Sequence, residues 1–441
     1  MLASKLSEDK NVSVLLLEAG SDHSKIRESQ VPLMFTKMFH TEQDWNYYTK
    51  EQSNLGSRSL FWPRGKMLGG CTSLNAMMYH HCSKSDFDEW VDVHGCTGWG
   101  YNDVGPYLRR MERFRPNSSR PRLDLQHRGS NGEWHTGHSW LTDISDKGFI
   151  PGCKDIGLPE VHDINTMNGP LGVTRFPTFI DSKGQRSSLA TAYLTPAVLA
   201  RPNLSVACHA HVTKLLMDTI TEDTPKVIGV QIQAKRDATP YLVHARKEVI
   251  LSGGAVNTPQ ILMLSGIGPY DELEKHGLPH IKDLEAVGRH LKDHLCATPV
   301  MCKAKQGTTL DYLGSAASAL PALARWMLLG TGPLSSNAGE AAAFIRTFEH
   351  NPPGAQSFPK DNSSGKTAPD VEIIGVPLAF VHHGEEAPSD NSPVFTIIPI
   401  GLRPKSEGSI TLRSRDPFDH GKHPFFPPHS LPPHSPMYLW I

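Results

Sequence analysis

Hydrophobic positions along the chain fall into short runs that predict a mixture of strands and helices. The run from Val12 to Glu18 is almost continuously apolar, which is typical of a parallel strand buried on both faces. It follows residues 2–8, which have the character of a helix end, so the two together predict the second half of a β-α-β unit. Residues 247–268 predict a strand, a glycine turn and a short helix with Thr258 as its N-cap.

Elsewhere in the chain, the pattern predicts helices before residue 330 and strands after residue 370. Residues 86–114 are expected to form helical pieces, and residues 310–330 an amphipathic helix that ends at Gly330. Polar, proline-rich stretches at 115–135 and 351–370 predict loops. Further strands are expected at residues 371–376, 394–400 and 409–414. From Gly421 onward, the chain has six prolines and three histidines in 21 residues, which excludes a helix or a central strand there.

Composition places the chain among globular proteins. Of its 441 residues 38% are hydrophobic and 20% charged, and the net charge of −1 gives no basic excess that would indicate a nucleic-acid partner. No apolar run reaches the roughly 18 residues of a membrane-spanning helix. The seven cysteines are odd in number and include no C-x-x-C pair, which argues against a disulfide scaffold and against a zinc site.

Two features carry candidate chemistry. Glu18 ends the first apolar run, where a dinucleotide fold places the acidic residue that binds ribose hydroxyls, but a solvated strand-end glutamate is an equal alternative. Gly69 and Gly70 would let the backbone approach a planar ring and point amides at an anionic group. Asn75 adds a donor and an acceptor on the same segment. Taken alone, these glycines are better explained by a tight turn before a buried helix.

Longer motifs give a family resemblance. The segment from Trp62 to His80 resembles the first signature of the glucose–methanol–choline (GMC) oxidoreductases, and the segment from Gly254 to Gly268 resembles their second signature. Further segments in register are residues 15–20, 184–197, 201–206, 287–294 and 406–419. The resemblance runs from residue 1 to about residue 420.

The resemblance implies a bound FAD and a two-electron oxidation of a small-molecule alcohol. By this likeness Glu18 would hold the adenosine ribose, and Val212 would contact adenine through its backbone. The remaining cofactor contacts come from two segments. Gly69, Gly70 and Cys71 would pack against the pyrophosphate and flavin, Asn75, Ala76, Met77 and Met78 would line the isoalloxazine, and Gly253 and Gly254 would end a strand beside the cofactor.

The resemblance also implies the architecture. The expected fold class is α/β, with a Rossmann-like FAD-binding domain interleaved with an α+β substrate domain that contains an antiparallel sheet. Residues 1–300 would be mainly the FAD-binding domain, with inserted substrate-domain pieces around residues 150–200. Residues 301–420 would form the substrate-binding domain, and residues 421–441 an aberrant tail rich in proline and histidine.

Several positions depart from the family pattern. Cys71 stands where serine is commoner, and Leu74 stands where some members carry a histidine bonded covalently to the flavin. The run from His80 to Cys82 raises a metal hypothesis, but adjacent side chains in an extended segment point to opposite faces, so no metal ligand is assigned.

The family's phosphate loop and catalytic histidine would lie before Met1 and after Ile441. No catalytic residue is therefore assigned, and His420 and His423 lie in a different part of the fold. Three interpretations remain open. The first is an FAD-dependent oxidoreductase that acts on the CH–OH group of an alcohol. The second is an inactive truncated form that lacks the phosphate loop and the catalytic histidine. The third is a non-redox lyase on the same flavin fold.

Overall fold

A computed structural model describes residues 1–116, 123, 125–218, 225–297, 299–349, 360–384 and 392–420. The predicted tail at 421–441 lies outside these residues, as do parts of the loops predicted at 115–135 and 351–370. In the described part of the chain, no helix is long and apolar enough to cross a membrane.

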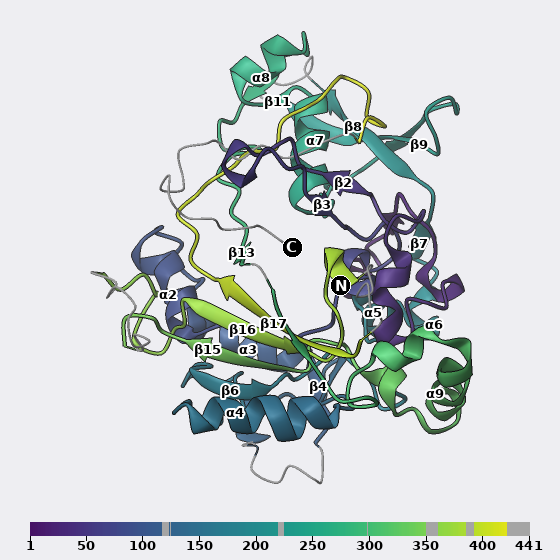
Figure 1. The fold of residues 1–441 in the computed structure, drawn as a ribbon. Helices are drawn as coiled ribbons and strands as arrows, with labels where there is room; N and C mark the ends of the chain where they lie inside the picture. The colour runs from purple at the N-terminus through teal and green to yellow at the C-terminus, as the bar shows by residue number, and fades with distance from the viewer. Residues whose placement is uncertain are drawn as a thin grey trace.

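The largest sheet is antiparallel and includes the strands predicted late in the chain (Figure 1). Its order in the described residues is β13-β17-β16-β15-β6, with β14 also paired to β17. The strands are β6 (Gly172–Arg175), β13 (Leu295–Cys296), β14 (Val300–Lys303), β15 (Ala341–Ile345), β16 (Val371–Val376) and β17 (Val394–Gly401). The strands predicted at 371–376 and 394–400 are therefore confirmed. β6 joins this sheet from residues 172–175, although the division into domains stays a prediction.

The strand predicted at residues 409–414 is wrong. This stretch forms no ladder: Ser409 has a single bridge assignment, and the neighbouring Gly408 forms an isolated bridge with Leu291. The backbone N–H groups of Ile410 and Leu412 donate instead to the carbonyl of Gly288 and to the Glu272 carboxylate. With these donors directed at a turn and a side chain, no neighbouring strand can form a ladder here.

The parallel part of the structure is small. β1 (Val14–Leu17) pairs in parallel with β7 (Leu204–Ala207), and in the described residues it has no second neighbour. Burial of β1 on both faces was wrongly predicted, because Leu15 is 44% exposed. Residues 247–253 form no strand either, since no described strand offers them a ladder partner.

A three-stranded antiparallel sheet follows β7 in the chain and was not predicted. It consists of β8 (His211–Asp218), β9 (Lys226–Gln233) and β10 (Tyr241–His244) in the order β10-β9-β8. Its apolar side chains pack with Leu17 of β1 and Ile261. The three strands therefore join the parallel pair in one core.

Alternation along β15 divides the core around the large sheet. Ala342 and Phe344 join one buried cluster, which also contains Met67 and Leu74 of the glycine-rich segment. Ala341 and Ala343 point to the other face and pack with Ile150 at the start of α4 (Ile150–Asp155) and its neighbours. Figure 1 shows α4 beside β6. The glycine-rich segment and α4 therefore cover opposite faces of the sheet.

The helices mostly follow the predicted pattern. α1 ends at Leu6, and the helical pieces predicted at 86–114 are α2 and α3. The helix predicted at 310–330 is α9, and the residue that follows it, Gly330, has a left-handed backbone conformation. The helices are α1 (Leu2–Leu6), α2 (Lys84–Asp92), α3 (Tyr101–Met111), α5 (Leu189–Tyr193), α6 (Pro196–Leu199), α7 (Gly254–Leu264), α8 (Tyr270–Lys275) and α9 (Ala316–Leu329). Short strands are β2 (Tyr47–Tyr48), β3 (Phe61–Trp62), β4 (Glu112–Phe114), β5 (Trp134–Thr136), β11 (Ile267–Gly268) and β12 (Lys282–Asp283).

Candidate cofactor site

Glu18 lies directly after β1, as predicted. One oxygen of its carboxylate, Oε1, accepts a hydrogen bond from the N–H of Gly20 at 2.7 Å. Burial raises the pKa of Glu18, and the nearby Lys66 ammonium acts in the opposite direction. A carboxylate in this position is held by its own turn and has acceptor capacity remaining for a ligand hydroxyl.

The glycine-rich segment packs against the turn that follows Glu18. The N–H of Leu68 donates to the carbonyl of Ser21 at 3.0 Å, and a Cβ added to Gly20 would lie 1.7 Å from the carbonyl oxygen of Lys66. Only a residue without a side chain permits this approach. The structure therefore brings Glu18 and the segment that begins at Gly69 together, although the two are 51 positions apart in the sequence.

Val212 reaches the same region from β8. The N–H groups of His209 and Ala210 donate to the carbonyls of Gly20 and Glu18, at 2.8 and 2.9 Å. Val212 follows two residues later, and its side chain packs in the cluster that contains Leu17. The predicted adenine contact is thus placed beside the predicted ribose contact, and their roles toward a cofactor stay predictions.

Residues 71–78 include both exposed and buried positions. Cys71 and Asn75 are exposed, whereas Leu74 and Met77 are buried and Ala76 and Met78 are partly buried. Buried side chains anchor the segment to the core, and the exposed side chains of Cys71 and Asn75 lie where a ligand could contact them.

Arg186 fixes Asn75 and was not singled out by the sequence. Its Nη1 donates to the backbone carbonyl of Asn75 at 2.6 Å and to its Oδ1 at 3.1 Å. Arg186 is 3% exposed, and burial lowers its pKa to about 9. Arg186 lies inside the segment 184–197 that resembles the family, and this resemblance could have marked it as a site residue. Nothing in the sequence showed which element its side chain would contact.

Gly253 and Gly254 are exposed at the start of α7. The helix begins at Gly254, so the prediction of Thr258 as N-cap is wrong by one turn, and Pro259 lies inside the helix. α7 is tied to β8 because the N–H of Leu215 donates to Ser265 Oγ at 2.8 Å.

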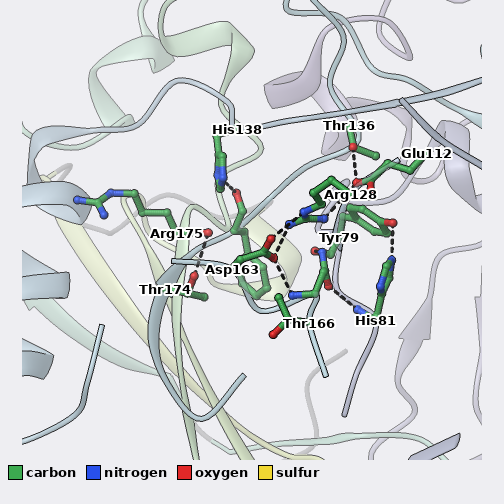
Figure 2. A network of polar contacts seen from close by, with 12 residues as sticks. Tyr79, His81, Glu112, Arg128, Thr136, His138, Asp163, Thr166, Thr174 and Arg175 are labelled. Carbon is green, nitrogen blue, oxygen red and sulfur yellow. Dashed lines mark hydrogen bonds and ion pairs between the residues drawn. The ribbon is translucent and has the colours of Figure 1, made fainter. Parts of the chain in front are cut away.

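A buried polar network holds the segment after Met78 in place (Figure 2). Arg128 pairs with Asp163 through two hydrogen bonds of 2.9 and 2.6 Å and with Glu112 at 3.1 Å. Tyr79 bonds His81 Nε2, and burial lowers the pKa of His81 to about 3. These groups are satisfied by one another, so the network stabilises the fold beside the candidate site.

The remaining histidine candidates have other surroundings. The His80 ring packs near Phe344, at 5.9 Å between centroids, so it points away from the bond that His81 makes. No group of three or more His, Cys, Asp or Glu side chains in the described residues is arranged to hold a metal. His420 packs against the Trp45 ring, and His423 lies outside the described residues.

Residues 14–296 match the family model described as GMC oxidoreductase. The chain belongs to the GMC oxidoreductase family. It is 38% identical over 453 residues to dehydrogenase str4 of Strobilurus tenacellus, which covers 100% of this chain and 72% of the relative. It is 32% identical over 428 residues to the oxygen-dependent choline dehydrogenase of Brucella anthropi, which covers 94% and 69% respectively.

Solved structures agree with this membership. A formate oxidase crystal structure superposes with a TM-score of 0.83 at 26% identity, over 95% of this chain and 73% of that one. An R554K variant of the Aspergillus oryzae formate oxidase, studied for FAD modification, gives 0.84 at 27% identity with the same coverage. The predicted family, the α/β fold class with its antiparallel sheet and FAD as the family cofactor are confirmed.

Proposed function

We propose that this chain binds FAD and acts as an oxidoreductase on the CH–OH group of a small-molecule alcohol. The observation that carries the proposal is the contact between the turn after Glu18 and the segment of residues 66–70, which unites the expected ribose and pyrophosphate contacts. Membership of a family of FAD-dependent alcohol oxidases and dehydrogenases supports the reaction class.

The residues present fit an FAD. A Cβ added to Gly70 or to Gly254 would meet no atom within 4 Å, so a ligand could approach both backbones closely. Two buried polar atoms beside the flavin segment, Arg186 Nη2 and Asn337 Oδ1, have no hydrogen-bond partner among the described residues. Buried donors and acceptors are usually satisfied, so these atoms mark a place where a polar ligand would fit.

Each residue has a defined task in this proposal. Glu18 accepts hydrogen bonds from the ribose hydroxyls. Asn75 would hold the flavin through its Nδ2, since its Oδ1 already accepts from Arg186 and from the N–H of Met77, and Met78 packs against the large sheet. FAD, when bound, supplies the two-electron acceptor to which the alcohol carbon transfers hydride.

The first experiment quantifies flavin released from the purified protein by denaturation. We expect FAD in near-stoichiometric amount, and we expect Glu18→Ala to weaken its binding by about tenfold, because the hydrogen bonds of a charged acceptor are lost. Glu51→Ala changes an exposed carboxylate and serves as the matched control, with unchanged flavin content. Absence of flavin from the wild-type chain would refute the proposal.

The second interpretation, an inactive form, is tested separately. Anaerobic addition of alcohols to the flavin-loaded protein separates the two readings. Bleaching of the flavin absorbance supports the oxidoreductase, and bound flavin that no alcohol reduces supports the inactive form.

A further inference from the structure

Arg186 carries a buried positive charge, and every hydrogen-bond acceptor that it meets among the described residues is neutral. The residue is 3% exposed. Its Nε donates to the carbonyl of Ser29 at 2.9 Å, and its Nη1 donates to the carbonyl of Thr72 at 3.3 Å and to two oxygens of Asn75. Carbonyl and amide oxygens satisfy N–H donors but do not neutralise the charge of a guanidinium group.

Two other arginines in the described ranges are similarly buried, and both have carboxylate partners. Arg128 lies between Glu112 and Asp163, and Arg346 is paired with Asp361. A buried charge without such a partner is costly. The contrast therefore indicates that the third buried arginine is balanced by negative charge that the chain itself does not supply.

The charge of Arg186 is held in one place beside the predicted flavin segment. Its own N–H donates to the carbonyl of Gln30 at 3.0 Å, and its side chain binds Ser29 on one side and Asn75 on the other. The helix that follows is fixed to the same segment, because the N–H of Leu189 donates to Thr72 Oγ1 at 3.0 Å. Burial lowers the pKa of Arg186 only to about 9, so the guanidinium is charged at neutral pH.

One side of the guanidinium is left open by these contacts. Nη2 is buried but has no hydrogen-bond partner among the described residues. Asn337 Oδ1, the other unpaired atom beside this segment, belongs to a side chain whose Nδ2 donates to the carbonyl of Ala76 at 3.0 Å. Buried polar atoms are usually satisfied, so the open donor and the unbalanced charge together indicate an electron-rich or anionic group next to residues 72–76.

We propose that Arg186 makes a flavin bound at residues 69–78 easier to reduce. The inference rests on the proposed function, because it requires FAD at this segment. In the proposed reaction the alcohol carbon transfers a hydride, which is two electrons and one proton, and the hydroxyl proton leaves to solvent. The substrate becomes a neutral carbonyl compound and the flavin ring gains one negative charge. A fixed cation attracts the charged, reduced ring and not the neutral, oxidised one, so it favours reduction.

Arg186 touches Asn75 and no reacting atom, so its effect is measured as a potential and not as a rate. Sulfite is a second probe that needs no alcohol. Its sulfur lone pair forms a bond to a ring nitrogen of oxidised flavin, and the ring takes up the negative charge. A cation near the ring therefore strengthens sulfite binding and raises the midpoint potential for the same electrostatic reason.

The first measurement uses the wild-type protein loaded with FAD. We expect its midpoint potential to lie above that of free FAD, and we expect the bound flavin to take up sulfite roughly tenfold more tightly than free FAD or better. A midpoint potential at or below that of free FAD would overturn the inference without the use of any variant.

Two variants separate the charge of Arg186 from its hydrogen bonds. Arg186→Gln keeps N–H donors but removes the charge, whereas Arg186→Lys keeps the charge but removes the planar fork. Arg186→Gln should weaken sulfite binding about tenfold and lower the midpoint potential by about 30 mV, which is the same tenfold change for a two-electron couple. Arg186→Lys should stay within about threefold of wild type. The exposed Arg110→Gln is the matched control and should change neither quantity.

A purely structural role gives a different result. Both substitutions at Arg186 would then reduce the amount of bound flavin, and the flavin that remains would keep the potential and sulfite affinity of wild type. This result would overturn the inference.

The two proposals fail in different ways. If alcohols reduce the flavin but Arg186→Gln has the potential of wild type, the inference about Arg186 fails and the proposed function stands. If the charge of Arg186 changes the potential but no alcohol reduces the flavin, the inference stands and the proposed reaction fails. If the wild-type chain binds no flavin, both proposals are refuted.

Discussion

Replacing Glu372 with glutamine should stabilise the folded protein above neutral pH. Glu372 lies on β16 and is 6% exposed, and burial raises the pKa of its carboxyl from 4.5 to about 7. The folded state therefore binds more protons than the unfolded state between these two values, so stability falls as the pH rises through that window. At 1.36 kcal/mol per pKa unit, the full penalty above pH 7 is about 3 kcal/mol.

The variant removes only part of this penalty. A buried glutamine amide without partners itself costs about 1 kcal/mol, so the expected net gain at about pH 8 is about 2 kcal/mol. At about pH 5 most of the wild-type carboxyl is protonated in the folded state, and the gain should shrink to below about 1 kcal/mol.

Urea unfolding of the ligand-free protein at both pH values measures this difference. The facing thiols of Cys82 and Cys296 have pKa values raised to about 11 and 12, so they stay neutral throughout the range and do not contribute. Glu51→Gln at the surface is the matched control and should change stability by less than about 0.5 kcal/mol. If Glu372→Gln were less stable than wild type at pH 8, the carboxylate would have an internal partner, and the reasoning would be refuted.

Two further changes test the packing around the candidate site. Arg128→Met leaves the buried carboxylates of Glu112 and Asp163 without their cation and should cost about 3–5 kcal/mol of unfolding free energy in urea, and a loss below about 1 kcal/mol would contradict the buried pairing. Gly20→Ala places a Cβ 1.7 Å from the carbonyl oxygen of Lys66 and should lower the free energy of unfolding by more than about 2 kcal/mol. The thermal midpoint and the flavin content should both fall. A Gly20→Ala protein with wild-type stability would show that the two segments are not in contact.

Local patterns predicted a helix, which satisfies its own backbone hydrogen bonds, and two apolar strands. The helix at 316–329 carries an apolar face and a terminal glycine, and the strands at 371–376 and 394–401 are apolar segments that pair with each other. Residues 247–253 and 409–414 have similar composition but form no ladder. A strand depends on a neighbour elsewhere in the chain, and that neighbour is not visible in the segment itself.

The sequence predicted the candidate-site residues that lie in motifs, but it did not predict the residues that contact them in the fold. Glu18 and the segment from Gly69 were recognised by register, and the structure joins them through backbone contacts that are invisible in the sequence. Arg186 was missed because its partner, Asn75, is 111 positions away.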